Sequence, residues 1–235
     1  MENVCVKLQV PIESTNIDRY FHGDPAVDKH VTKVFDNIAR WYVDQSKRTS
    51  FLPFLMDFSG SGRVDQSCRN TSGSGPAGIS FYCDSLRKTR ECLAGAVAWV
   101  TWDLTGAAVI VLCPSFFIQP IANQCFSSVP RNPGQLSNAD QGGFILYELT
   151  HIPWLNDGQP IGDGFAPGGS SLNCYTNACA TGLAANRNNP RVDPRNLPER
   201  NAANYEIYAY QVRATENICG LRDAIGALYG YMQGS

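Results

Sequence analysis

The stretch "GGFILYELTHIPWLNDGQPIGDGFAPGG", residues 142–169, is the most informative part of this sequence. Ser137 or Asn138 can cap a helix just before it, and we expect that helix to run to about Trp154. From 156 to 198 the chain is rich in Gly, Asn and Pro, which predicts a long loop of the kind often used for a site. The stretch therefore joins a helix to a candidate site loop.

The expected helix contains Tyr-Glu-Leu-Thr-His, residues 147–151. With histidine in place of Tyr147, this segment would carry H-E-x-x-H, in which two histidines one helical turn apart hold one zinc ion. The glutamate of that signature polarises zinc-bound water and acts as general base. Glu148 and His151 stand at the general-base and second-ligand positions, and Asp163 follows in "PIGDGF". A Glu and a His three residues apart are by themselves a weak signal.

The surrounding residues strengthen that signal, because they resemble the deuterolysin-like metalloendopeptidases, the aspzincins, which are secreted mostly by fungi. Members carry H-E-x-T-H followed by G-T-x-D-x-x-Y-G, and the aspartate of the second element is the third zinc ligand. Here "YELTH" and "PIGDGFAPG" place Asp163 at that aspartate. The strand-ending "LCPSFF" (112–117) and "NAANYEIYA" (201–209), similar to the family's N-A-D-N-Y helix, extend the resemblance over roughly 107–215.

The resemblance implies an α+β, zincin-like metalloprotease fold in a single domain over 1–235. It implies an N-terminal helix and a twisted sheet over an active-site helix, a helical C-terminal part, and a site cleft between 107–154 and 156–215. The periodicity of the sequence independently gives an α+β order without an internal repeat. It predicts helices at 24–48, from about 201 and at about 221–230, and β-rich runs at 78–84, 96–102 and 107–113.

Two local signals refine this expectation. Asp24 followed by Pro25 is a sound helix start, with Asp as the cap and Pro at the first helical position. The segment Leu93–Leu112 is apolar and long enough to span a membrane, but Asp103 lies inside it. The segment "TWDLTG" is typical of a turn. We therefore predict a buried hairpin there.

The sequence departs from the family pattern at four positions, while Glu148, His151 and Asp163 are kept. The departures are Tyr147 for the first histidine ligand, Ala166 for the tyrosine thought to steady the oxyanion, Pro167 for the final glycine, and Ala203 for the aspartate of N-A-D-N-Y. The candidate catalytic residues are accordingly Glu148, Tyr147, His151 and Asp163. The candidate metal ligands, if a metal is bound, are His151, Asp163 and Tyr147.

Tyr147 is a poor replacement for a zinc-binding histidine. A phenol has a pKa of about 10, so ionising it at pH 7 costs roughly 4 kcal/mol before a metal contributes. Its ring is also longer than imidazole, which moves the metal away from the helix. The other histidines, His22 and His30, belong to the N-terminal part of the chain. We expect no cofactor at high occupancy, and zinc only if the site is functional.

Three functions follow from these residues. The first is a secreted, deuterolysin-like pseudo-peptidase with an altered metal site, acting by binding or as an effector. The second is an active metalloendopeptidase with a Tyr-His-Asp site. The third is a repurposed enzyme that uses the acid–base groups on a small molecule, in a pocket walled by Phe116, Phe117, Trp154 and Phe165. The corresponding partner is a peptide, a protein or a small-molecule ligand in the cleft.

Composition indicates the compartment in which the protein folds. Nine cysteines without paired C-x-x-C spacing predict disulfides and an oxidising compartment. Cys83 with Cys92 and Cys174 with Cys179 are the nearest pairs, but spacing does not fix the connectivity. Asn70-Thr-Ser is a glycosylation sequon, and together these features predict a secreted glycoprotein.

The ends and the charge of the chain add two expectations. "MENVCVKLQV" lacks the apolar region of a signal peptide, and we interpret this start as replacing a removed leader. The net charge of −2 and the lack of any Lys/Arg run argue against binding to nucleic acid or to anionic membranes.

Overall fold

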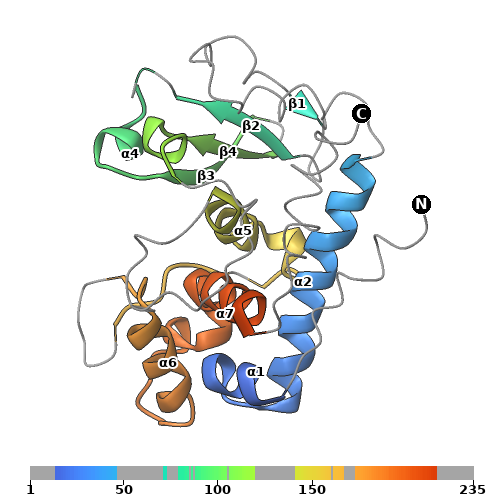
Figure 1. The fold of residues 1–235 in the computed structure, drawn as a ribbon, viewed down its shortest axis with the longest axis vertical. Coiled ribbons are helices and arrows are strands. Elements are labelled where there is room, and N and C mark those ends of the chain that lie inside the picture. The colour runs from blue at the N-terminus through green and yellow to red at the C-terminus, as the bar shows by residue number, and fades with distance from the viewer. Residues whose placement is uncertain are drawn as a thin grey trace.

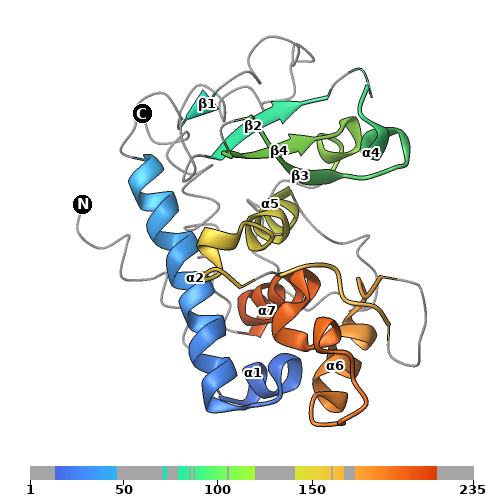
Figure 2. The ribbon, with the colours of Figure 1, turned by 180° about the vertical axis from the view of Figure 1, so that it is seen from behind.

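The computed structural model describes residues 14–46, 71–72, 79–84, 86, 88–104, 106–119, 141–159, 161–166 and 173–215. Within this part the fold is α+β, as predicted. A mixed sheet forms one half, helices form the other, and α2 (Pro25–Ser46) runs alongside both, as Figures 1 and 2 show from opposite sides. The helix α5 (Gln141–Thr150) lies between the sheet and α7 (Ala202–Thr215) and packs against α7 and β3.

The sheet consists of three five-residue strands and one very short edge strand, in the order β1-β2-β4-β3. The strand β2 (Ile79–Cys83) pairs in parallel with β4 (Ala108–Leu112). The strand β3 (Ala98–Trp102) pairs antiparallel with β4, which confirms the predicted hairpin. The strand β1 (Thr71–Ser72) pairs antiparallel with β2. No helix in the described residues is both long and apolar enough to cross a membrane.

Two hydrophobic cores lie on either side of α5. One fills the space between the sheet and α5 and includes Ile110 and Leu149, which are almost completely buried. The other joins α1 (Ser14–Phe21), α2 and α7, where Phe21 packs edge-on against Tyr205 with ring centroids 5.0 Å apart. The Tyr147 ring packs against this second core. The helix α5 therefore contributes to the sheet core while presenting Tyr147 to the helical core.

The N-terminal helices show what periodicity captured and what it missed. The predicted cap is confirmed, because the backbone N–H of Ala26 donates to Asp24 Oδ1 at 2.8 Å. The apolar stripe of α2 is also confirmed, with Val27, Val31, Val34 and Trp41 buried. The short α1 was not predicted, although Ile17, Tyr20 and Phe21 recur at helical spacing and are fully buried.

Two expectations about the central region are wrong. The helix α5 ends at Thr150, not at about Trp154, since Pro153 disfavours helical backbone in the residue before it, and Pro153–Leu155 forms a separate 3-10 turn. The supposed loop 156–198 contains α6 (Asn177–Asn186). Its start is capped by Thr176, whose hydroxyl accepts from the Cys179 N–H at 3.2 Å. The predicted helix start at 137–138 lies outside the described residues.

The C-terminal helix is where it was expected. It runs over Ala202–Thr215, and Tyr205, Tyr208 and Ala209 are buried together. The predicted final helix at 221–230 lies outside the described residues.

Disulfides are present, as predicted. Cys92 in α4 (Arg90–Leu93) is bonded to Cys113 at the end of β4, and Cys174 is bonded to Cys179. Cys83 is also disulfide-bonded. Of the two nearest pairs in sequence, Cys174–Cys179 is therefore a real bond, whereas Cys83 and Cys92 do not pair. Asn70 of the sequon lies outside the described residues.

Candidate functional site

The helix α5 and the turn after it hold three of the four predicted site residues. Tyr147 and His151 lie one helical turn apart, so their rings meet edge-on with centroids 4.9 Å apart. Glu148 lies between them in sequence but turns toward the sheet, where its carboxyl group accepts a hydrogen bond from the backbone N–H of Val100 in β3. Only 4% of Glu148 is exposed. The four predicted residues are thus neighbours, but Glu148 faces a different element.

Asp163 is the centre of the site. The Tyr147 hydroxyl donates to its Oδ1, and the Tyr175 hydroxyl donates to its Oδ2 at 3.0 Å. The His151 Nε2 lies 3.5 Å from the same Oδ1. The Asn173 amide in turn donates to the Tyr175 hydroxyl at 2.6 Å. Asp163 therefore accepts hydrogen bonds from two tyrosines in distant segments of the chain and lies beside His151.

The orientation of His151 is set by its other nitrogen. Nδ1 lies 2.9 Å from the carbonyl oxygen of Ile161, and a carbonyl oxygen only accepts hydrogen bonds, so Nδ1 carries a proton. In the neutral imidazole, Nε2 then has a lone pair directed toward the Asp163 carboxyl group. Histidines that bind metals are held in the same way, with one N–H donated to a carbonyl and the other nitrogen free to coordinate.

Backbone hydrogen bonds on both sides of Asp163 fix its position. The Gly162 N–H donates to the Arg200 carbonyl at 3.0 Å, and the Ala202 N–H donates to the Gly162 carbonyl at 2.9 Å. On the other side, the Gly164 N–H donates to Asn201 Oδ1 at 3.0 Å. Asp163 is therefore held against the start of α7.

The two asparagines of the "NAANY" segment, Asn201 and Asn204, form a buried hydrogen-bond network. The fully buried Asn201 amide donates to the Cys174 carbonyl at 3.2 Å and to Asn204 Oδ1 at 2.7 Å. The Asn204 amide donates to the carbonyls of Tyr20 and Ala180 at 2.6 and 3.1 Å. This network ties α1, α6 and α7 to the two segments that carry Asp163 and Tyr175.

Burial changes the acid–base properties of the site. The pKa of the Glu148 carboxyl group is raised to about 8, mainly by burial and further by the carboxylates of Asp163 and Glu206. Burial likewise raises the pKa of Tyr147 far above that of a free phenol, and Asp163 adds to the effect. Burial also raises the pKa of Tyr175. At neutral pH and without a metal, these three groups are protonated.

The sequence did not single out Tyr175. It lies between Cys174, which is held by a disulfide and by a backbone bond to Gly164, and Thr176, which caps α6. The sequence signal for Tyr175 as a site residue was weak, because a tyrosine in a cysteine-rich turn has no characteristic spacing from the other site residues. Its hydroxyl nevertheless reaches Asp163, whereas Ala166, where the resemblance led us to look for a tyrosine, has no hydroxyl group.

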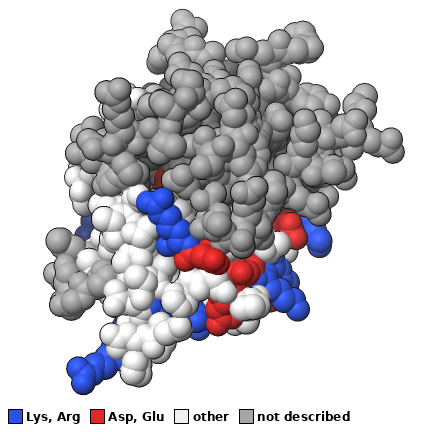
Figure 3. Space-filling model, turned by 60° about the horizontal axis from the view of Figure 1, so that its bottom comes forward, with Lys and Arg blue, Asp and Glu red and all other residues white. Residues whose placement is uncertain are grey.

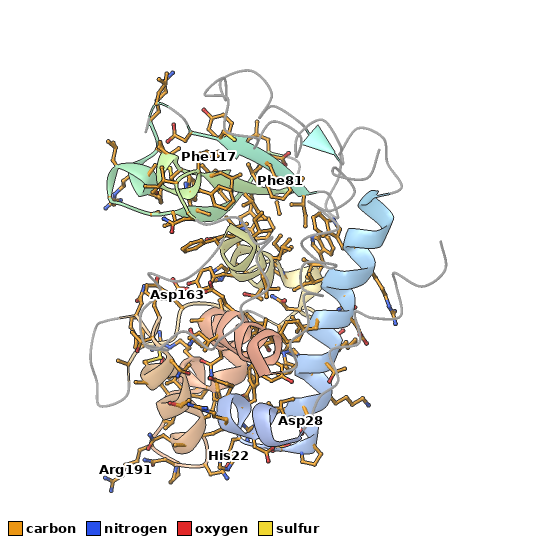
Figure 4. All side chains as sticks on the ribbon, in the orientation of Figure 1. His22, Asp28, Phe81, Phe117, Asp163 and Arg191 are labelled. Atoms are coloured by element: carbon orange, nitrogen blue, oxygen red, sulfur yellow. A yellow bond between two sulfur atoms is a disulfide. The ribbon has the colours of Figure 1, made fainter. Side chains whose placement is uncertain are left out.

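The other candidates do not join the site. His22 Nε2 lies 2.7 Å from Asn188 Nδ2, at the far end of the helical half from Asp163 (Figure 4). His30 lies on α2, and its pKa is lowered by burial. Phe116 is fully buried in the core between sheet and α5, where Phe117 and Trp154 pack beside it. These three aromatic side chains belong to that core, whereas Phe165, two residues after Asp163, is 40% exposed. The pocket expected between these four residues stays a prediction.

The residues present do not fit an ordinary zinc centre. Zinc in proteins is held by Cys, His and carboxylate groups, with three of them at a catalytic site. In the part of the chain that the structure describes, no three His, Cys, Asp or Glu side chains gather closely enough to hold a metal ion. His151 and Asp163 supply two such donors, and the remaining donors at this point are phenols.

No model of a known protein family matches this chain, and no curated protein sequence is significantly similar to it.

Proposed function

We propose that this chain is a secreted, deuterolysin-like protein with an altered metal site that acts by binding and lacks classical zinc endopeptidase activity. The zincin-like character of the fold is part of this proposal. One observation carries it: the hydroxyl of Tyr147, at the first-ligand position, is hydrogen-bonded to Asp163, at the third-ligand position. Two groups that would have to face a zinc ion instead satisfy each other.

The physical cost of restoring zinc supports this reading. A zinc ion would have to break the Tyr147–Asp163 hydrogen bond and remove the phenol proton, at roughly 4 kcal/mol for an ordinary phenol at pH 7. Loss of even an outer-shell partner lowers zinc affinity roughly 10–100-fold. Glu148, the inherited general base, is also buried against β3.

The edge of the sheet supports binding of an extended peptide. The strand β3 is last in the strand order and pairs with β4 on one side only in the described residues. An edge strand offers backbone groups to which a peptide can add as a further strand, and here such a peptide would have to displace the Glu148 carboxyl group from the Val100 N–H. Trp102, at the end of β3, is 46% exposed and offers an aromatic contact beside that edge.

Disulfides and surface charge support the compartment and the partner class. The bonds Cys92–Cys113 and Cys174–Cys179 are typical of proteins folded in an oxidising compartment. On the face shown in Figure 3, acidic and basic side chains lie side by side. Arg187, for example, forms ion pairs with Asp24 and Glu199. With a net charge of −2, this mixed surface favours a protein partner over nucleic acid.

A second candidate, an active metalloendopeptidase with a Tyr-His-Asp site, is favoured by Tyr175. Its hydroxyl lies 3.0 Å from Asp163 Oδ2 and could take the role of the tyrosine missing at Ala166. The two candidates differ in whether zinc binds and whether peptide bonds are cut.

Metal analysis and proteolysis separate the two candidates. The chain is purified without chelator, incubated with zinc, desalted and analysed for bound metal, and casein cleavage is followed with and without EDTA. We expect no stoichiometric zinc and no EDTA-sensitive cleavage. One zinc per chain together with EDTA-sensitive cleavage would establish the peptidase instead.

A histidine at position 147 tests whether the ligand position is inherited. Tyr147→His places a second imidazole one turn from His151 and should raise zinc affinity at least tenfold. Tyr82→His, on an exposed position of β2, is the matched control and should bind no more zinc than the natural chain. Equal zinc binding by the two variants would contradict a site derived from H-E-x-x-H.

A further inference from the structure

We propose that Tyr147, His151, Asp163 and Tyr175 together form a site for a hard trivalent metal ion. Ferric iron is the ion that we expect to bind there in place of zinc. This inference rests on the proposed function in one respect, namely that the inherited zinc position is altered. At that position we expect a different ion, and one of its ligands, Tyr175, is absent from the family pattern.

The donor atoms of the other three side chains all lie against the carboxyl group of Asp163. Tyr147 and Tyr175 approach the two different oxygens of Asp163, and the His151 Nε2 lies 3.5 Å from Oδ1. The two phenol rings lie edge-on with centroids 6.1 Å apart. Ligand atoms that share an octahedral cation with bonds of about 2 Å lie roughly 3 Å apart. The Tyr175–Asp163 and His151–Asp163 distances of 3.0 and 3.5 Å are close to that value, and the Tyr147 hydroxyl contacts the same carboxyl group.

The chemical nature of the donors selects the ion. Three of the four are oxygen atoms, and hard oxygen donors favour hard, highly charged cations, whereas thiolate and imidazole suit softer ones. Tyrosine oxygen is a known ligand of iron, as in the haem site of catalase. The cluster contains no cysteine, since Cys174 beside Tyr175 is already in a disulfide.

Charge balance points the same way. With both phenols ionised, Tyr147, Tyr175 and Asp163 carry one negative charge each and the neutral His151 carries none. A trivalent ion neutralises that set, whereas a divalent ion leaves an uncompensated negative charge in a partly buried site. His151 is only 15% exposed and Asp163 34%, so this imbalance would be felt.

The protein holds these donors ready for an ion. His151 is oriented by its bond to the Ile161 carbonyl, which leaves Nε2 free to coordinate. The Asn173 amide donates to the Tyr175 oxygen at 2.6 Å and would stabilise the phenolate. The disulfide of Cys174 and the Asn201 network fix the two loops that carry Tyr175 and Asp163.

Binding follows a simple balance. Each phenol gives up its proton to water or buffer as its oxygen bonds to the metal, the hydrogen bonds to Asp163 are exchanged for metal–oxygen bonds, and the ion keeps its oxidation state. Affinity should therefore rise with pH. Coordination positions that the four side chains leave open are filled by water or a small anion.

The test uses the full chain titrated with a ferric chelate, ferric nitrilotriacetate, in buffer free of other metals. Phenolate bound to ferric iron gives a charge-transfer band in the visible range, which free tyrosine and bound zinc do not give. We expect this band to saturate at one iron per chain and to be accompanied by proton release in weakly buffered solution. Gallium(III), which has the same charge and no redox chemistry, should prevent the band from forming, and excess zinc should not.

Single-atom variants assign the band to these residues. Tyr147→Phe and Tyr175→Phe each remove one hydroxyl and should weaken ferric binding by at least the roughly 10–100-fold that an outer-shell partner contributes. Tyr82→Phe, an exposed tyrosine outside the cluster, should bind like the natural chain. Far-UV circular dichroism checks that each variant is folded. His151→Gln removes the imidazole and keeps both tyrosines, so it should weaken ferric binding independently of the tyrosine variants.

Each outcome decides one proposal. No visible band at equimolar iron, or an equal band in the natural chain and in the Tyr147→Phe/Tyr175→Phe double variant, would overturn the ferric site while leaving the absence of zinc peptidase activity untouched. Zinc that binds one per chain and displaces the iron, with EDTA-sensitive casein cleavage, would overturn both proposals.

Discussion

The Asn201 side chain accepts the backbone N–H of Gly164 at 3.0 Å, across 37 positions of sequence, and so holds Asp163 against the start of α7. The same side chain donates to Cys174 and Asn204. One buried amide therefore positions both loops of the candidate site. The geometry at Asp163 depends on this residue although it does not touch the donor cluster.

Replacing Asn201 by alanine should lower the stability of the protein and loosen the two loops that carry Asp163 and Tyr175. The substitution leaves the Gly164 N–H, the Cys174 carbonyl and the Asn204 amide without this partner, and we expect the free energy of unfolding to fall by about 2–4 kcal/mol. Denaturant unfolding measures the loss. Asn188→Ala, which removes an exposed contact with His22, is the control and should change stability by less than about 0.5 kcal/mol. Similar losses in both variants would refute this role for Asn201.

The glycines on either side of Asp163 should respond differently to alanine. A Cβ at Gly164 would lie 3.2 Å from Asn201 Cβ and from Leu183 Cδ1, whereas a Cβ at Gly162 would meet nothing within 4 Å. We expect Gly164→Ala to lower the free energy of unfolding by about 1–3 kcal/mol because the start of α7 must move. Gly162→Ala should be close to neutral. Thermal unfolding of the two variants checks the order, and a larger loss at Gly162 would contradict the packing described here.

The disulfides Cys92–Cys113 and Cys174–Cys179 should contribute differently to stability and to the site. Cys92–Cys113 spans 21 positions and Cys174–Cys179 spans 5, so loop-closure entropy gives about 3 kcal/mol for the first and about 2 kcal/mol for the second. Paired Cys→Ala variants measure both. We expect the Cys174/Cys179 variant to lose ferric affinity as well, because Tyr175 follows Cys174. Ferric affinity falling only in the Cys92/Cys113 variant would contradict that link.

Glu148 should make stability depend on pH in the metal-free chain. Its pKa is about 8 when folded, against an ordinary value of 4.5, so the folded chain holds a proton that the unfolded chain releases. The free energy of unfolding should therefore fall as pH rises from about 4.5 to about 8, by about 5 kcal/mol, and level off above that.

Glu148→Gln keeps the acceptor for the Val100 N–H and removes the titration. The difference between the natural chain and this variant, measured by denaturant unfolding in EDTA across pH 4–9, should reproduce that slope. Parallel pH profiles for the two proteins would show that Glu148 is not responsible.

Much of the architecture could be predicted locally. The apolar stripe of α2 with its Asp24 cap, the β3–β4 hairpin around Asp103, and the start of α7 near Asn201 all follow from short-range rules of periodicity, capping and turn formation. The helix α6 was missed because Gly, Asn and Pro around it are typical of loops. The end of α5 was misplaced because the effect of Pro153 on the residue before it was not weighed.

The sequence by itself determined the α+β order, the presence of disulfides, and the grouping of Tyr147, His151 and Asp163 as one candidate site. Only the tertiary structure decided which cysteines pair, that Glu148 turns to β3, and that Tyr175 rather than a residue near Ala166 reaches Asp163. The reason is physical: periodicity and capping act over one or two helical turns, whereas the Tyr175–Asp163 contact depends on how α6 and α7 pack around the Asn201 network.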